Sequence, residues 1–335
     1  MYRARVLSAF DPDDPAQPES GIYGLPHGPA EARVHVLGVP FDATASYRKG
    51  AARGPDAVLR ASRQVELFAR DGARPYEHGI WMAAPDPRVA ALNEEALALG
   101  ASDLGRANAI GAELNALVED AVGAALDAGR LPAVVGGDHS VPFGAFRAAA
   151  ARHPGLGILH FDAHADLRLA YEGFEWSHAS IFRNALERLS GVARLVQVGV
   201  RDVARGEAAF IDASHGRVRT LFDAEWAAAA FDGRDRRALA REWIGLLPEV
   251  VWISFDVDGL EPALCPNTGT PVPGGLSWHD ALLWLDELAR SGRTVVGLDL
   301  CEVNPGEAAP DEDAWDAIVG ARLLYRLIAT ALAGR

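Results

Sequence analysis

Acidic and histidine side chains gather at the ends of four apolar runs of this sequence. The run LHFDAHADLR places two aspartates around one histidine at alternate positions. Three further runs, VVGGDHS, SFDVD and DLCEV, carry a histidine, a pair of aspartates and a glutamate near their ends. The candidate functional residues in these four segments are His139, Asp162, His164, Asp166, Asp256, Asp258 and Glu302.

So many carboxylates need a chemical reason to lie together. Buried side by side, they would repel one another and would bind protons rather than stay charged. Divalent cations remove that repulsion, and oxygen-rich donors with some imidazole favour a hard ion such as Mn²⁺ over thiolate-rich zinc sites. Two histidines and four aspartates exceed what one open catalytic ion needs. The count therefore predicts two ions, about 3.5–4 Å apart, that activate water for hydrolysis.

These residues can converge only if the elements that carry them end at one edge of a sheet. Short apolar runs, many of them β-branched, predict six strands at 33–41, 132–137, 156–164, 194–200, 250–258 and 294–303. Their apolar residues occupy successive positions, which is typical of parallel strands covered on both faces. Helical patterns lie between the strands, so we expect an α/β fold whose strand ends share one crevice.

Two helix boundaries can be predicted from local signals. Residues 107–129 repeat apolar side chains at helical spacing, and Gly129 is a typical helix stop. Ser277 and Asp280 have the spacing of a capping box, which predicts a helix that begins just after Ser277.

Composition indicates how the chain is organised. Residues 1–32 are rich in Pro, Gly and Asp and show no periodicity, so we expect an irregular N-terminal arm before a single domain at 33–335. The 335 residues are 49% hydrophobic, which is enough for a large core. Cys265 and Cys301 have no CxxC spacing and predict neither a disulfide framework nor a zinc ribbon.

The net charge and the hydropathy of the sequence limit the kinds of molecule that the protein is expected to bind. The formal charge of −14 argues against nucleic acid or an anionic membrane as a partner and suits a small cationic substrate. No run is apolar enough to cross a bilayer, and the N-terminus has no apolar core of a signal peptide. We therefore expect a cytoplasmic protein.

Five segments in a fixed order resemble a known family. GGDHS, DAHAD, SFDVDGLEP, TGTPVPGG and EVNP, taken in this order, are similar to segments of the ureohydrolases, which include arginase and agmatinase. The resemblance covers about residues 33–332. It implies a three-layer α/β/α sandwich around a mostly parallel eight-stranded sheet, two Mn²⁺ ions per subunit, and assembly as a homotrimer or homohexamer.

The resemblance also implies a role for each candidate residue. One manganese ion would be bound by His139, Asp162, Asp166 and Asp256. The other would be bound by His164, Asp258 and the shared Asp162 and Asp256. The activated water would attack the guanidinium carbon and release urea and an amine. Asp166 would orient that water, Glu302 would pair with the guanidinium, and His178, in EWSHASIFR, would pass a proton to the departing amine.

Two neighbouring residues receive structural interpretations. His160 lies within a predicted strand, so we expect it in the core or behind the metal ligands. Asp138 precedes His139, and we interpret it as a partner of the ligands or as a turn residue.

The identity of the substrate is less strongly indicated than the reaction. DLRLAYEGFEWSHAS and TGTPVPGG resemble agmatinase-type members, which favours hydrolysis of agmatine to putrescine and urea. Arg168 follows the metal cluster and favours instead a substrate carboxylate, as in 4-guanidinobutyrate or formimidoylglutamate, or it forms a structural ion pair. Asn267 before TGTP and the N-terminal extension also depart from plain agmatinases. Aminopropylagmatine, arginine and guanidine stay open as substrates.

Two interpretations from other functional classes stay open as well. One is a non-catalytic paralogue that binds metal, although retention of all six predicted ligands argues against it. The other is a single-zinc deacetylase on a related fold, which would leave several carboxylates without a role. Metal stoichiometry separates a hydrolase with two manganese ions from a deacetylase with one zinc ion.

Overall fold

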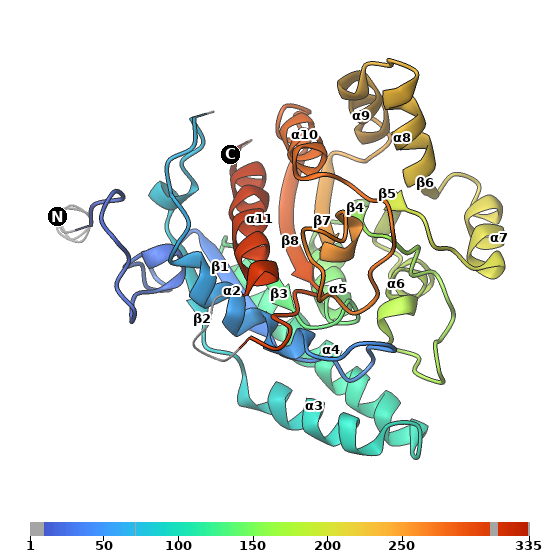
Figure 1. Cartoon of the computed structure of the whole chain (residues 1–335). Coiled ribbons are helices and arrows are strands. Elements are labelled where there is room, and N and C mark those ends of the chain that lie inside the picture. The colour runs from blue at the N-terminus through green and yellow to red at the C-terminus, as the bar shows by residue number, and fades with distance from the viewer. Residues whose placement is uncertain (1–9, 71, 309–313, 334–335) are drawn as a thin grey trace.

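One eight-stranded parallel sheet forms the centre of the molecule (Figure 1). The computed structural model describes residues 10–70, 72–308 and 314–333. The strands are β1 (Val34–Val39), β2 (Ile80–Ala83), β3 (Leu131–Gly136), β4 (Leu156–Phe161), β5 (Val192–Val200), β6 (Val218–Phe222), β7 (Val250–Asp256) and β8 (Thr294–Cys301). Their order is β2-β1-β3-β8-β7-β4-β5-β6, and each of these neighbouring pairs is parallel.

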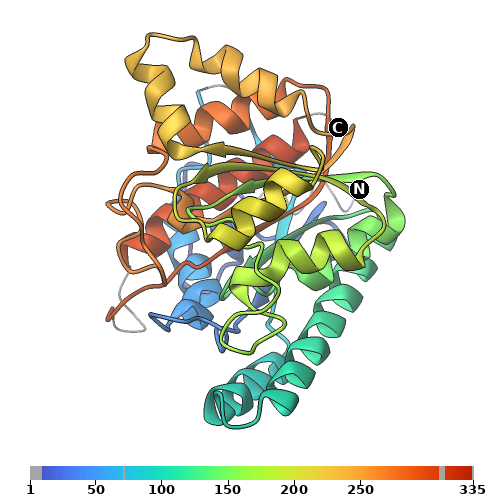
Figure 2. The same cartoon turned by 90° about the vertical axis from the view of Figure 1, so that its right-hand side faces the viewer.

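Helices cover both faces of this sheet and complete three layers (Figure 2). One face packs against α2 (Gly54–Ser62), α8 (Asp223–Phe231), α9 (Arg236–Ile244), α10 (Trp278–Ala289) and α11 (Trp315–Leu332). The other packs against α3 (Pro87–Leu99), α4 (Leu104–Asp127), α5 (Phe143–Arg152), α6 (Ile181–Arg188) and α7 (Arg205–Ala213). Short 3₁₀ helices are η1 (Ile22–Gly24), η2 (Ala51–Arg53), η3 (Pro75–His78), η4 (His178–Ser180) and η5 (Val257–Gly259). The predicted α/β/α sandwich is confirmed.

The six predicted strands correspond to β1, β3, β4, β5, β7 and β8, and the two that were not predicted lie at the edges of the sheet. The central strands β3 and β4 are buried at every position. By contrast, β2 is fully buried only at Ile80, and β6 alternates buried and exposed residues at its start. β2 is an apolar run of only four residues, which is too short to indicate a strand by itself, and in β6 Arg219 and Thr220 interrupt the apolar pattern.

The predicted helix signals agree with the structure. The predicted helix at 107–129 is part of α4, which begins three residues earlier because the Asp103 side chain accepts the backbone N–H of Arg106. It ends at Asp127, and Gly129 adopts the left-handed conformation with φ 67°. The capping box of Ser277 and Asp280 is confirmed at the start of α10.

Part of the predicted N-terminal arm packs against the domain. Ile22, Tyr23 and Leu25 are buried in the hydrophobic core. The Tyr23 hydroxyl donates a hydrogen bond to the Ala321 carbonyl of α11. The division at residue 33 stays a prediction, and residues 1–9 lie outside the described part of the chain. Among the described helices, none combines the length and apolarity that crossing a membrane requires.

Candidate metal centre

The predicted ligands and Glu302 lie at the carboxyl ends of four strands that are neighbours in the sheet, β3, β8, β7 and β4. His139 follows β3, Asp162 follows β4, Asp256 is the last residue of β7, and Glu302 follows β8. Parallel strands place all their carboxyl ends at one edge, which is why segments far apart in the sequence meet here. The structure therefore brings the predicted residues together.

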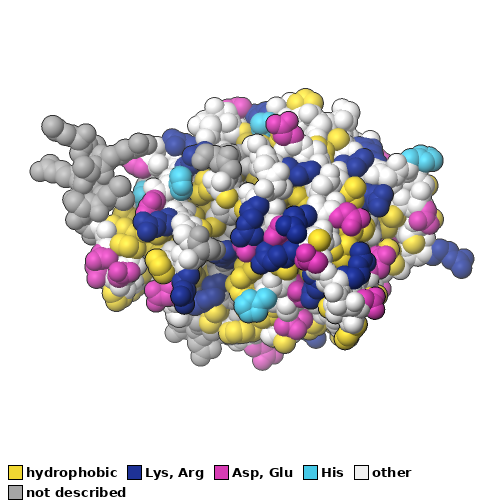
Figure 3. Space-filling model, turned by 90° about the horizontal axis from the view of Figure 1, so that it is seen from above, with side chains coloured by type: hydrophobic (Ala, Val, Ile, Leu, Met, Phe, Trp, Pro, Cys, Tyr) yellow, Lys and Arg dark blue, Asp and Glu magenta, His cyan; other side chains and the backbone are white. Residues whose placement is uncertain are grey.

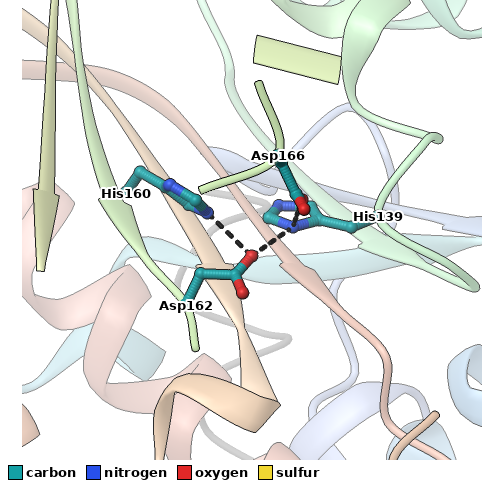
Figure 4. Close-up of side chains that lie close together, drawn as sticks. All are labelled: His139, His160, Asp162 and Asp166. Carbon is teal, nitrogen blue, oxygen red and sulfur yellow. Dashed lines mark hydrogen bonds and ion pairs between the residues drawn. The ribbon is translucent and has the colours of Figure 1, made fainter. Parts of the chain in front are cut away.

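Carboxylates surround His139, and Figure 4 shows two of them, Asp162 and Asp166, together with His160. The Nδ1 atom of His139 lies 3.0 Å from Asp162 Oδ2, 3.3 Å from Asp166 Oδ2 and 3.3 Å from Asp256 Oδ2. All four side chains are buried. These residues are the four that the sequence assigned to the first manganese ion.

A second group surrounds His164. Its Nδ1 atom lies 3.1 Å from Asp258 Oδ2 and 3.3 Å from Asp162 Oδ1. The two oxygens of Asp162 therefore face different histidines, as a carboxylate shared between two ions requires. Asp256 Oδ2 faces His139 of the first group, and its Oδ1 accepts the backbone N–H of Asp258 at 2.9 Å; that Asp256 is shared between two ions stays a prediction.

The hydrogen bonds of His139 determine which of its nitrogens faces the carboxylates. Its Nε2 lies 2.9 Å from Ser254 Oγ, and the Ser254 hydroxyl donates to Asp299 Oδ1 at 2.8 Å. Because that hydroxyl proton is already used, Oγ accepts the proton of Nε2. Nδ1 can then present a lone pair beside three carboxylates, an arrangement that fits a metal cation. Partners of this kind are typical of metal-binding histidines.

Without a cation, burial and neighbouring charges change the pKa values of the carboxylates at the centre. Burial and then the charge of Asp162 raise the pKa of Asp166 to about 8. Burial raises the pKa of Asp256 and of Glu302, and neighbouring aspartates raise both further. Burial alone would lower the pKa of His139, but its carboxylate partners raise it well above the usual value. The protein atoms thus take up protons where positive charge is missing.

Glu302 and Asp166 adopt a backbone conformation that is rare for residues other than glycine. Their φ angles are 63° and 53°, in the left-handed region. Glu302 Oε1 accepts the backbone N–H of His139 at 3.1 Å, whereas Oε2 is buried without a hydrogen-bond partner. A Cβ atom at Gly269 would come within 3.1 Å of Oε2, so glycine leaves this oxygen room for a donor.

A cavity of about 450 Å³ opens beside the ligands. His164 and Asp166 line it together with His178, whose ring lies at the start of η4. Glu302 does not line the cavity; its Oε2 lies beside Gly269, and the next residue, Thr270, is a lining residue. The predicted contact between Glu302 and a substrate therefore stays a prediction.

His178 is held by residues that follow β1, which sequence reasoning did not single out. Its Nε2 lies 3.3 Å from Ser46 Oγ, and its backbone N–H donates to Thr44 Oγ1 at 3.3 Å. Thr44 in turn donates to Asp138 Oδ2 at 2.7 Å, so Asp138 supports this wall of the site. Burial lowers the pKa of His178, which favours the neutral imidazole. Their place at the end of a strand was the signal that could have found Thr44 and Ser46.

The outer wall of the cavity carries charges of both signs. Arg168 Nε lies 4.0 Å from Glu207 Oε2, and its guanidinium carbon lies 4.8 Å from the centre of the Tyr171 ring. Asp202 also lines the cavity and is exposed. Among the described residues, no Lys, Arg or His nitrogen lies within 4.0 Å of its carboxylate. Sequence reasoning missed Asp202 because no local pattern marks it.

Comparisons with known proteins agree with this geometry. The model of the arginase family matches residues 32–329. The chain is 35% identical to an N(1)-aminopropylagmatine ureohydrolase of Thermus thermophilus, over 92% of this chain and 93% of the relative. It is 32% identical to proclavaminate amidinohydrolase of Streptomyces clavuligerus, over 90% and 91% of the two chains. The structure of agmatine ureohydrolase of Thermoplasma volcanium superimposes with a TM-score of 0.71 at 25% identity, covering 98% of each chain.

Proposed function

The chain belongs to the arginase family of guanidino hydrolases, and on this premise we propose that it binds two Mn²⁺ ions and hydrolyses a guanidino substrate to urea and an amine. The observation that carries the proposal is the environment of His139, whose Nδ1 lies within 3.3 Å of three carboxylate oxygens. One imidazole proton can satisfy only one of these three carboxylates, whereas a divalent cation can bind all three together with the histidine nitrogen.

The proposed ligands of the first ion are His139, Asp162, Asp166 and Asp256. Those of the second are His164, Asp258 and the shared Asp162 and Asp256. When bound, two such ions would supply a water of lowered pKa as the nucleophile and would polarise the substrate. The protein contributes ligands that are already in place and buried.

Three residues then act on water and substrate. Asp166 lines the cavity, where its carboxylate can accept a hydrogen bond from the attacking water and orient it. The unpartnered Oε2 of Glu302 is the acceptor that we assign to the guanidinium N–H groups. His178 lines the same cavity, and because burial lowers its pKa it is neutral near pH 7 and can carry a proton toward the departing amine.

Agmatine, a guanidino compound with a distal amine, is the substrate that we propose. Asp202 supports this choice because its carboxylate lines the cavity without a cationic partner and can attract a second positive charge. The relatives named as acting on aminopropylagmatine and agmatine give further support.

A substrate with a carboxylate is the second candidate. Arg168 supports it, since its side chain is 40% exposed and lines the cavity. Against it, Glu207 and the Tyr171 ring already contact the Arg168 guanidinium. 4-Guanidinobutyrate and formimidoylglutamate are the compounds that test this candidate.

Cellular location and assembly are proposed on the family resemblance. We propose a cytoplasmic homo-oligomer, a trimer or a hexamer. Large apolar side chains that are exposed in the single chain, such as Phe231 at 89% and Leu169 at 66%, support association between subunits.

Metal content and urea release together test the proposal. The metal-free protein is loaded with Mn²⁺, the bound metal is counted, and urea is measured with agmatine, N(1)-aminopropylagmatine, 4-guanidinobutyrate, arginine and guanidine, with ammonia or formamide followed for formimidoylglutamate. We expect two ions per chain and fastest turnover with agmatine. Fastest turnover of 4-guanidinobutyrate would favour the second candidate. Two ions without turnover of any compound would favour a non-catalytic paralogue. A second sample is loaded with Zn²⁺, and binding of one zinc ion there without binding of two Mn²⁺ ions would favour a deacetylase.

A further inference from the structure

A row of buried polar side chains crosses the sheet directly behind the metal centre. Its members, which we call the polar row, are Thr220, Gln197, His160, Ser254 and Asp299. They lie on β6, β5, β4, β7 and β8, and each is the register partner of the next. Four of them are completely buried, and Thr220 is 8% exposed. Five neighbouring polar positions in the middle of an apolar sheet need a reason, because each costs free energy unless it is hydrogen-bonded.

Hydrogen bonds in one half of the row run in a single direction. The Thr220 hydroxyl donates to Gln197 Oε1 at 2.9 Å. Gln197 Nε2 donates to the Ala165 carbonyl at 2.8 Å and to His160 Nδ1 at 3.0 Å. The carbonyl can only accept, so it fixes which end of the Gln197 amide carries the N–H groups. His160 Nδ1 is therefore an acceptor, and the ring proton is on Nε2.

This chain of hydrogen bonds ends at the metal centre. His160 Nε2 donates to Asp162 Oδ2 at 2.9 Å (Figure 4). The other oxygen, Oδ1, accepts the backbone N–H of His164 at 2.6 Å. Asp162 is thus held at both oxygens, and its carboxylate cannot rotate without breaking one of these bonds.

The other half of the row ends on His139. Asp299 accepts the Trp252 indole N–H at 2.7 Å and the Ser254 hydroxyl at 2.8 Å. Ser254 Oγ then accepts the proton of His139 Nε2. The two halves therefore fix one aspartate and one histidine of the same proposed ion site.

We infer that Thr220, Gln197 and His160 are positioning residues that hold Asp162 in the orientation needed to bind both ions. The inference rests on the proposed metal site but concerns residues that touch neither ion nor substrate. Outer partners of this kind typically change metal affinity about 10–100-fold when removed, because they orient the ligand before the ion arrives. The row extends that support to Thr220 on an edge strand, two side chains away from Asp162.

The Thr220 hydroxyl offers the gentlest test, because its removal leaves the side-chain volume nearly unchanged. In Thr220→Val, Gln197 loses its donor, and we expect Mn²⁺ to dissociate more readily, by about tenfold at most, the low end for such partners. Thr220→Ser keeps the hydroxyl and should restore wild-type affinity. Thr330→Val is the matched control, since Thr330 is also 8% exposed and lies on α11. It should leave metal affinity unchanged.

His160 contacts Asp162 directly and should give the larger effect. His160→Phe removes the donor to Asp162 Oδ2, and we expect affinity for Mn²⁺ to fall by about 10–100-fold. His160→Gln can place an amide N–H where Nε2 lies and should recover part of the loss.

Metal affinity of the purified protein is the measurement, independent of turnover. Free Mn²⁺ is followed by electron paramagnetic resonance during titration of each metal-free variant, and thermal unfolding without metal checks that each variant is folded. Weaker binding by Thr220→Val and His160→Phe, with recovery in Thr220→Ser and His160→Gln, supports the inference. Equal affinity in Thr220→Val, Thr220→Ser and wild type overturns it. If the wild-type protein binds no Mn²⁺, the proposed function fails first.

Discussion

Two of the regions that bury carboxylates give these groups different partners. On the outer helices, Glu287 of α10 is 4% exposed and lies 2.7 Å from Arg237, 3.3 Å from Arg290 and 3.8 Å from Arg241. The face above the amino ends of the strands likewise shows Lys and Arg beside Asp and Glu (Figure 3). At the metal centre, no Lys or Arg side-chain nitrogen of the described residues lies within 4.0 Å of a carboxylate oxygen of the predicted ligands or of Glu302, although Arg201 donates to the backbone carbonyl of Asp258 at 2.6 Å.

This difference indicates what each group of carboxylates is for. A buried carboxylate beside arginines is neutralised by the protein itself and serves packing and stability. At the metal centre, burial and neighbouring aspartates raise the pKa values of Asp166, Asp256 and Glu302, whereas at Asp162 burial is outweighed by the surrounding histidines, which lower the pKa. The second arrangement keeps its carboxylates charged only if a cation comes from outside the chain, and otherwise the site binds protons. The carboxylates at the sheet edge are therefore suited to bind cations, whereas those on the outer helices are already neutralised by arginines.

Replacing the shared ligand should have the largest effect on metal binding and on urea release. In Asp162→Asn, one of the two proposed bridging carboxylates loses its charge, and both ions should bind weakly. Because the ions supply several kcal/mol of transition-state stabilisation, we expect urea release to fall by about 10³-fold or more. Metal content and urea release are measured on the same sample. Two bound ions and normal turnover would show that Asp162 is not the shared ligand.

His178 separates metal binding from proton transfer. His178→Ala should retain two Mn²⁺ ions, since the side chain contacts Ser46 rather than the ligands, while turnover falls by about 10²–10⁴-fold. Steady-state kinetics on metal-loaded protein check this outcome. Turnover like that of the wild type would assign His178 a structural role.

Replacing Asp202 tests whether a carboxylate on the cavity wall, outside the metal centre, contributes to substrate selection. In Asp202→Asn, we expect KM for agmatine to rise by up to about fivefold with kcat little changed, because an exposed charge contributes at most about 1 kcal/mol. KM for guanidine, which has no distal amine, should stay constant and is the control. An equal rise in KM for both compounds would contradict the proposed contact.

Replacing Glu287 should give the smallest effect, and it tests the carboxylate that arginines neutralise on the outer helices. Glu287→Gln removes the charge that three arginines share, but these arginines are about half exposed and are hydrated without it. We expect the free energy of unfolding to fall by about 1 kcal/mol, with metal content and urea release unchanged. Denaturant unfolding measures the first effect. A loss of bound metal would mean that the two regions are not independent.

The sequence by itself determined the central strands and the chemistry at their ends. The runs that became β3, β4, β7 and β8 are mostly apolar and almost completely buried because helices cover both faces, so their pattern is visible locally. The ligand types follow them directly in the chain. His139, Asp162, His164, Asp166, Asp256 and Asp258 could therefore be selected without coordinates, and the structure places them together.

Only the tertiary structure decided which side chains meet across the sheet. Thr220 and Gln197 carry no local signal, and for His160 the sequence indicated only a place in the core or behind the ligands. Their hydrogen bonds exist because strand order and register make the three residues neighbours. The same holds for the Arg168 contact with Glu207 and for the Asp202 carboxylate on the cavity wall. Local sequence records which faces are apolar, whereas contacts between residues far apart in the chain depend on packing that no single segment encodes.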